Sequence, residues 1–323
     1  MGELALIEWI RGHAIGAGAG EVVVGPGDDA AILRIGAELV AFATDAVVAG
    51  IHFGPGAAGS AVGWKALAAN VSDLAAVGAE PVASVAAVAL GTPGGDEYGR
   101  AVYEGLAACA AEFGCPVVGG DVSAAPEGAA TVVSVSVIGR FAGGARPVLR
   151  SGAAPGQPVY VTGELGGSGL GRHMEFRPRL AEGLWLAREG LAAAMIDVSD
   201  GLAADIAHIC RESGVGAVID EGAVPVSAAA REAAEESGRT ALEHALADGE
   251  DFELLFTVAP GDAAGLESGW PTDLRLTRLG ETTDRAGEIV LRTAAGGEGP
   301  IGVGGYEHGL GGGGAGGAGG SGA

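Results

Sequence analysis

Residues 25–33 read Gly25-Pro26-Gly27-Asp28-Asp29-Ala30-Ala31-Ile32-Leu33, a glycine-proline turn that carries two adjacent carboxylates and leads into an apolar strand. Similar aspartates, placed at strand ends or glycine turns among small or apolar residues, recur along the chain. An aspartate at such a place is ordinarily a turn former or a helix N-cap. A whole set with few basic residues nearby in sequence indicates a shared task. The set is Asp28, Asp29, Asp45, Asp73, Asp121, Asp197 and Asp200.

The chemistry of these aspartates points to metal ions. Carboxylates that are buried without a side-chain cation need a metal, and all-oxygen ligand sets suit Mg²⁺ or Mn²⁺. A magnesium-rich acidic site is a natural receptor for a nucleoside triphosphate, because the metal ions bridge phosphate oxygens. The chain has neither the GxxxxGK[ST] phosphate loop nor the motifs of protein kinases. The sequence therefore predicts a phosphate site outside both common kinase classes.

Composition limits the possible partners and compartment. The 323 residues are 48% hydrophobic, which is enough for two domains with buried cores. A formal charge of −23 repels nucleic acid and anionic membranes, so we expect neither as a partner. Three cysteines without ligand spacing argue against disulfides and structural zinc. With no signal-peptide pattern and no apolar stretch of the roughly 20 residues that span a bilayer, we expect a cytoplasmic protein.

Hydrophobic patterns predict interleaved strands and helices in both halves of the chain, which indicates α/β and α+β layers. Residues 64–77 have helical spacing and end before Gly78, a residue suited to a C-terminal cap. We place an N-terminal domain at residues 1–145, a C-terminal domain at 146–309, and a disordered glycine-alanine tail at 310–323.

Taken together, several blocks resemble thiamine-monophosphate kinases in order and spacing, over roughly residues 3–309. Several of them are shared with a wider ATP-binding superfamily that includes aminoimidazole ribonucleotide synthetase and selenophosphate synthetase. AGIHF, NVSDLAAVGAEP and GEDFELLF are more specific to the thiamine enzymes. The blocks are GPGDDAAIL, ATDAVVAGIHF, KALAANVSDLAAVGAEP, VVGGDVS, VLRSGAAPGQPVYVTGELG, IDVSDGLAADIAHI, GEDFELLFTV and GYEHG.

The resemblance implies a two-domain aminoimidazole ribonucleotide synthetase-like fold, whose N-terminal domain pairs with its copy to form a dimeric β-barrel-like core. It also implies that ATP and several Mg²⁺ ions bind in a cleft between the domains. The expected reaction passes the γ-phosphate of ATP directly to the phosphate of thiamine monophosphate, giving thiamine diphosphate. An acceptor phosphate is already ionised at neutral pH, so we name no catalytic base.

The resemblance also implies which residues form the site, one matching position at a time. The expected magnesium ligands are Asp29, Thr44, Asp45, Asp73, Asp121, Asp197 and Asp200. The expected nucleotide positions are Gly120, Asp121, Arg150 and Ser199, and the expected thiamine-phosphate positions are His52, Glu250 and Tyr306. The chain departs from the family pattern after Asp121, where Val122 and Ser123 replace the common Thr-Thr, and at Asp248, which replaces a glycine.

Three alternatives remain open at this point. The first is another ATP-dependent enzyme of the same superfamily with a different small acceptor. The second is a regulator that binds Mg²⁺ and nucleotide without turnover. The third is an acidic structural protein whose aspartates only cap helices and turns.

Overall fold

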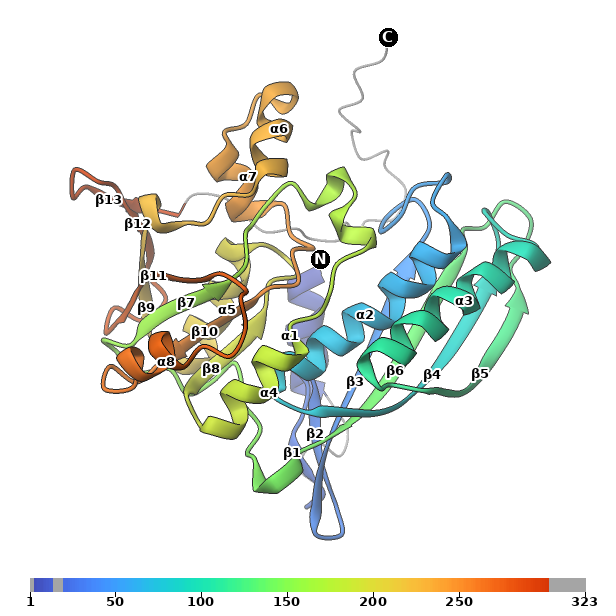
Figure 1. Cartoon of the computed structure of the whole chain (residues 1–323), viewed down its shortest axis with the longest axis horizontal. Helices are drawn as coiled ribbons and strands as arrows, with labels where there is room; N and C mark the ends of the chain where they lie inside the picture. Colours follow the sequence, from blue (N-terminus) through green and yellow to red (C-terminus); the bar gives the residue numbers. More distant parts are fainter. Residues whose placement is uncertain (1–2, 14–19, 302–323) are drawn as a thin grey trace.

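The computed structural model describes residues 3–13 and 20–301 and divides the strands between two β-sheets (Figure 1). The predicted tail at 310–323 and Tyr306 lie outside the described residues. The first sheet has the order β1-β2-β3-β6-β4-β5 and is antiparallel except where β4 meets β5. Its strands are β1 (Val22–Val24), β2 (Ala31–Ile35), β3 (Glu38–Val48), β4 (Glu80–Leu90), β5 (Val117–Ala124) and β6 (Val132–Arg140).

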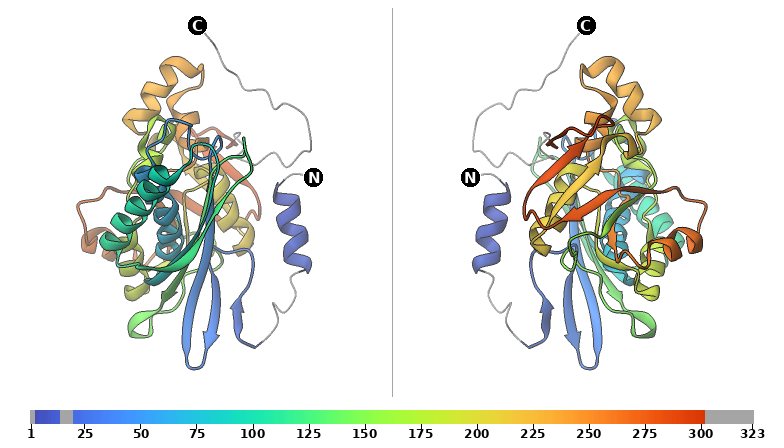
Figure 2. Two further views of the ribbon diagram at one scale, coloured as in Figure 1. Left: turned by 90° about the vertical axis from the view of Figure 1, so that its right-hand side faces the viewer. Right: turned by 90° about the vertical axis from the view of Figure 1, so that its left-hand side faces the viewer.

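Helices α2 (Gly59–Val77) and α3 (Asp96–Phe113) cover one face of this sheet (Figure 2), while α1 (Glu3–His13) stands on the other side. Glycines let α2 and α3 cross at close range. A Cβ on Gly63 would lie 1.9 Å from the carbonyl oxygen of Val102, and one on Gly105 would lie 1.8 Å from that of Ser60. The predicted helix at 64–77 is confirmed, and it begins five residues earlier, at Gly59.

The second sheet has the order β13-β12-β9-β11-β7-β10-β8 and separates two apolar clusters. Helix α5 (Leu202–Ser213) packs into one cluster, and α4 (Leu180–Glu189) with α8 (Ala263–Gly269) packs into the other. Helices α6 (Ala228–Ser237) and α7 (Ala241–Ala247) pack against each other. The strands are β7 (Pro158–Thr162), β8 (Ala192–Asp197), β9 (Gly216–Asp220), β10 (Leu254–Val258), β11 (Leu276–Thr283), β12 (Ile289–Arg292) and β13 (Glu298–Pro300).

Helix α2 joins the two halves of the molecule. Its Leu67 and Val71 lie in the core under the first sheet, whereas Ala75 and Ala76 pack with Leu186 and the second sheet. The predicted boundary at residue 145 lies in the connection between the sheets and stays a prediction. No helix in residues 3–13 and 20–301 is long and apolar enough to span a membrane.

Candidate active site between the two sheets

A cavity of about 460 Å³ opens where α2, the end of β3, the end of β8 and the loop before β10 meet. Carboxylates dominate its lining, and its only lining lysine or arginine side chains are Lys65 and Arg150. Most of the predicted site residues lie together on this wall: Asp29, Thr44, Asp45, His52, Asp73, Arg150, Asp197, Ser199, Asp200 and Glu250.

Three carboxylates from three different elements converge at one side of the cavity. Asp29 follows the Gly27 turn, Asp73 lies on α2, and Asp197 ends β8. One oxygen from each lies within 4.8 Å of the others. The Oδ2 atom of Asp29 is buried and has no hydrogen-bond partner in the described part of the chain. Such a group of oxygens suits a divalent cation.

Burial, with the negative charge of neighbouring carboxylates, raises the pKa of Asp73 and Asp197. Burial is the main cause for Asp73, whose pKa lies well above its usual range, and the charges of Asp45 and Asp197 add to it. Burial, with the charge of Asp29, raises the pKa of Asp197 to about 8, although a 2.5 Å hydrogen bond from Ser72 Oγ opposes the shift. In the absence of metal, Asp73 and Asp197 therefore hold protons that exposed aspartates would release.

Arg150 meets the cluster from the segment that precedes the second sheet. Its Nη2 and Nε donate to Asp29 Oδ1 at 2.6 and 3.2 Å. Its backbone N–H donates to Asp28 Oδ2 at 3.1 Å, while Asp28 Oδ1 accepts from Asp29 N–H at 3.1 Å. Burial and the neighbouring charge of Asp29 raise the pKa of Asp28 to about 7. Asp28 thus fastens the turn to Arg150.

Lys65 and Glu250 form another part of the cavity lining. Lys65 Nζ lies 2.5 Å from Glu250 Oε1 and donates to the carbonyl oxygen of His52 at 2.7 Å. His52 Nδ1 accepts from the N–H of Val48 at 3.0 Å, which ties its turn to the end of β3. An ion pair and a carbonyl contact therefore join α2, the His52 turn and the loop before β10.

The loop 248–253 has an unusual backbone. Glu250 and Phe252 adopt positive φ angles of 53° and 51°, which cost side-chain-bearing residues on the order of 1–3 kcal/mol each. The backbone N–H groups of the two residues donate to Ser199 O at 2.7 Å and to Val198 O at 2.8 Å. Phe252 also stacks on Phe176 with ring centroids 3.8 Å apart. These contacts hold a conformation that the isolated loop would not favour.

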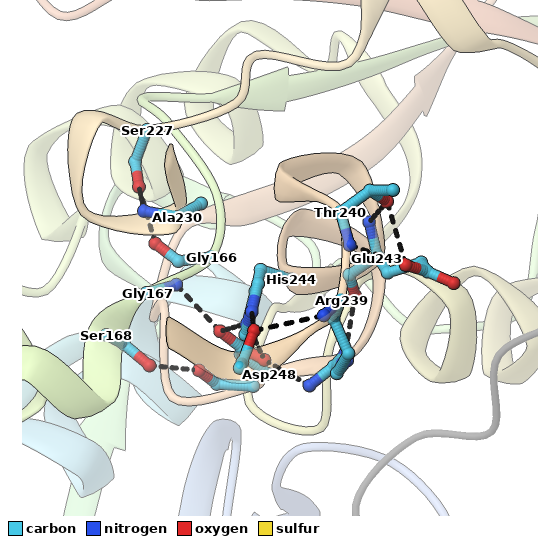
Figure 3. Close-up of polar contacts among 12 residues, drawn as sticks. Gly166, Gly167, Ser168, Ser227, Ala230, Arg239, Thr240, Glu243, His244 and Asp248 are labelled. Atoms are coloured by element: carbon cyan, nitrogen blue, oxygen red, sulfur yellow. Dashed lines mark hydrogen bonds and ion pairs between the residues drawn. The ribbon is translucent and has the colours of Figure 1, made fainter. Parts of the chain in front are cut away.

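Side chains on both sides of Glu250 fix the loop further. Figure 3 draws Asp248 among Gly167, Arg239 and His244, and its oxygens accept from these groups at 2.8–2.9 Å. Ser168 Oγ donates to the carbonyl of Gly249 at 2.5 Å. The remaining anchors are Asp251, which accepts from Gly166 N–H and Arg172, and Glu253, which accepts from Thr162 and Arg179.

Comparison with known proteins identifies the family of this fold. The family model described as AIR synthase related protein matches in two parts, its N-terminal domain at residues 27–141 and its C-terminal domain at 172–292. A thiamine-monophosphate kinase of Rhodopirellula baltica is 38% identical over 278 residues, which are 83% of this chain and 85% of that protein. A thiamine-monophosphate kinase of Salmonella typhimurium is 37% identical over 261 residues, which are 74% of this chain and 77% of that protein.

The chain belongs to the thiamine-monophosphate kinase family. A solved structure of AaThiL complexed with AMPPCP and TMP matches with a TM-score of 0.80 and 28% identity, over 95% of this chain and 97% of that one. The two-domain fold expected from the sequence is thereby confirmed.

Within this family fold, two of the expected nucleotide positions lie apart from the acidic cavity. Gly120 and Asp121 are on β5 and line a second hollow of about 790 Å³ between α3 and the sheet. The site expected from the sequence is therefore divided between two hollows, and Asp121 does not join Asp29, Asp73 and Asp197 in the lining of the acidic one.

Thr44 lines the acidic cavity, but its hydroxyl is partly occupied. It donates to Val135 O at 3.0 Å and accepts from Ser136 Oγ at 2.9 Å. A metal contact from Thr44 would therefore use the remaining lone pair of this hydroxyl or the backbone carbonyl oxygen.

The sequence did not point to two further features, one in the lining of the cavity and one beside its Asp200. Lys65 was not singled out as a site residue, although it is the only lysine among 18 basic residues. Asp205 and His208 on α5 each place a ligand atom within 4.8 Å of one on Asp200, and Asp200 N–H donates to Asp205 at 3.2 Å. The i, i+3 spacing of Asp205 and His208 on a helix was the available signal.

Proposed function

We propose that the protein is an ATP-dependent kinase that phosphorylates thiamine monophosphate to thiamine diphosphate. The observation that carries this proposal is one cavity whose lining holds both an acidic cluster and the Lys65–Glu250 pair. The cluster suits the metal-bound phosphates of a nucleotide, and Glu250 offers a carboxylate to a cationic thiazolium ring. Family membership and the AMPPCP and TMP of the matched complex support the same assignment.

The residues present fit magnesium. Within the described residues, Asp29 has a buried oxygen without a hydrogen-bond partner, and burial together with neighbouring carboxylates raises the pKa values of Asp73 and Asp197. We propose that the ions are held by Asp29, Asp45, Asp73, Asp197 and Asp200 and by Thr44, whereas Asp121, which the resemblance also assigns, lines the separate hollow on β5. Bound Mg²⁺ would offset the negative charge of the two phosphate groups that must approach each other.

The protein's own contribution is mainly positioning. Arg150 presents a guanidinium at the edge of the cluster, where its planar donors can take two phosphate oxygens at once. Ser199 lies in the same lining and can donate to phosphate. The hollow beside Gly120 and Asp121 offers room for the rest of the nucleotide. Because the acceptor is an ionised phosphate, no side chain is assigned as a general base.

We also propose a homodimer built on the open face of the first sheet. Phe42 pairs with Ile138 across β3 and β6, and Val85 shares their face through its pairing with Ser136. These apolar side chains are 42–45% exposed, on the face opposite α2 and α3. Two such faces can pair into the barrel-like core that the family resemblance implies. Light scattering should give twice the 31.3 kDa chain mass, and Phe42→Asp should give one chain mass.

The test of function measures ADP release from Mg·ATP with and without thiamine monophosphate, together with chromatography of thiamine diphosphate. Acceptor-dependent formation of both products in equal amounts is expected. ADP release that requires a different small phosphate acceptor would favour another enzyme of the superfamily. ATP binding by calorimetry with no product after hours would favour a nucleotide-binding regulator, and either result would overturn the proposal.

A further inference from the structure

Lys65 is a buried cation, and a buried cation needs charged or polar partners. Its side chain is 1% exposed, on the α2 face that meets the cavity. A buried ammonium loses its hydration and needs charged or polar partners in return. Burial lowers the pKa of Lys65, and the Glu250 carboxylate opposes that shift.

The two partners of Lys65 come from different halves of the molecule. Glu250 stands in the loop before β10 of the second sheet, and His52 follows β3 of the first sheet. Both are positions where the family resemblance puts thiamine phosphate. Glu250 is 31% exposed toward the cavity, so one of its sides faces solvent while Lys65 holds the other.

Other contacts fix the loop but leave the direction of the Glu250 side chain to Lys65. Glu250 N–H donates to Ser199 O, which places its backbone at the positive φ of 53°. The described side-chain ion pair of Glu250 is with Lys65 alone. The neighbours Asp248, Asp251 and Glu253 each have an arginine of their own. Loss of Lys65 should therefore release the Glu250 carboxylate without unfolding the loop.

The use of lysine is informative in a chain that otherwise uses arginine throughout. A lysine ammonium is a compact point charge whose donors point in several directions, whereas guanidinium is planar and larger. Simultaneous contact with a carboxylate on one segment and a carbonyl on another suits the ammonium.

We propose that Lys65 is a positioning residue for the acceptor, because it clamps the Glu250 carboxylate and the His52 turn at a fixed separation across the two halves of the molecule. This role rests on the function proposed above and makes the pair part of acceptor selection. The Lys65–Glu250 pair fits an acceptor that carries a cationic ring and an anionic phosphate. Glu250 can attract the ring, and Lys65 limits the net negative charge that the pair presents to the phosphate.

The test compares Lys65→Met, Glu250→Gln and the double variant in the full-length protein. Lys65→Met should raise KM for thiamine monophosphate at least tenfold and change KM for ATP less than twofold. If Lys65 acts through Glu250, it should have little further effect in the Glu250→Gln background. Arg177→Met is the matched control, since it removes the exposed Arg177–Glu112 ion pair between the same two halves, outside the cavity.

A merely structural lysine would behave differently. Lys65→Met would then lower the melting temperature, and kcat would fall because a smaller fraction of the protein is folded and active. KM for the acceptor would be unchanged. That result would overturn the proposal. Because Lys65 is the only lysine, ¹³Cε-lysine labelling gives a single side-chain NMR signal. The signal should move in Glu250→Gln, and an unchanged signal would also overturn the clamp.

Failure of the two proposals can be told apart. Wild-type protein that forms no thiamine diphosphate contradicts the proposed function, and the lysine signal still tests the clamp in that case. Wild-type turnover with unchanged acceptor KM in Lys65→Met contradicts the clamp alone.

Discussion

Asp73 lies among several carboxylates, since the charges of Asp45, Asp197 and Asp29 raise its pKa in addition to burial. We predict that Asp73→Asn lowers kcat at least about 100-fold, or about 2.7 kcal/mol of transition-state stabilisation, because a metal ligand is lost. The same change removes repulsion, so the metal-free variant should melt no lower than wild type. Calorimetry with and without Mg²⁺ checks this, with Asp273→Asn as an exposed control.

Two results would contradict a role for Asp73 as a metal ligand. Wild-type turnover in Asp73→Asn, or the same stabilisation by Mg²⁺ in both proteins, would remove Asp73 from the metal site.

The raised pKa values of Asp28, about 7, and Asp197, about 8, make stability depend on pH. Both carboxyls bind protons more tightly in the folded state than unfolded, so their contribution is fully present below about pH 4 and is lost as pH rises through 7 to 8. The free energy of unfolding of metal-free protein should therefore fall between pH 6 and 9. Urea denaturation in EDTA measures this free energy of unfolding. Excess Mg²⁺ should restore most of the lost stability at pH 9.

A stability that rises over this pH range in EDTA would contradict the crowded carboxylate cluster. Asp197→Asn should make the profile flatter, since it removes the group with the higher pKa.

At the scale of elements, the crossing of α2 and α3 depends on Gly63. An added Cβ would lie 1.9 Å from Val102 O, so Gly63→Ala must push the helices apart. We expect a loss of about 1–3 kcal/mol in the free energy of unfolding. Gly169→Ala is the control, because a Cβ there meets nothing within 4 Å. Equal urea midpoints for the two variants would show that the crossing tolerates the extra methyl group.

The loop 248–253 is a second element whose geometry can be tested. Asp248 accepts from Gly167 N–H, Arg239 and His244, so Asp248→Ala leaves several donors without their partner. We predict a local loss of about 1–3 kcal/mol, seen as faster hydrogen exchange at residues 249–253. KM for thiamine monophosphate should rise several-fold with it. An unchanged rate of hydrogen exchange at residues 249–253 would mean that the other contacts of the loop hold it without Asp248.

Long, regular elements were predictable from the sequence and irregular ones were not. Residues 64–77 and 202–213 show clear helical spacing and are helical in the structure. Strand β11 cannot be predicted from alternation, because its pairing shifts between Arg278 and Gly280, which interrupts the alternation of apolar residues. Helix α7 has only seven residues, too few for a period, although Thr240 and Glu243 form a capping box that marks its start.

At the scale of the whole molecule, the sequence indicated most of the aspartates that line the acidic cavity but not what they contact. Asp29 and Arg150 lie 121 positions apart, and the structure brings them to 2.6 Å. Lys65 and Glu250 are joined across the two halves in the same way. Turn and strand-end patterns identify candidate ligands because they are local. Charge partners and the division between two hollows depend on domain packing, which no local pattern encodes.

Direct transfer between two substrates in one cavity is the central claim, and single-turnover transfer from γ-³²P-labelled ATP tests it most directly. The account predicts that label appears in thiamine diphosphate at the rate of ADP formation, requires Mg²⁺, and does not accumulate on the protein. Label released as inorganic phosphate, or retained on the protein while thiamine monophosphate stays unmodified, would contradict it.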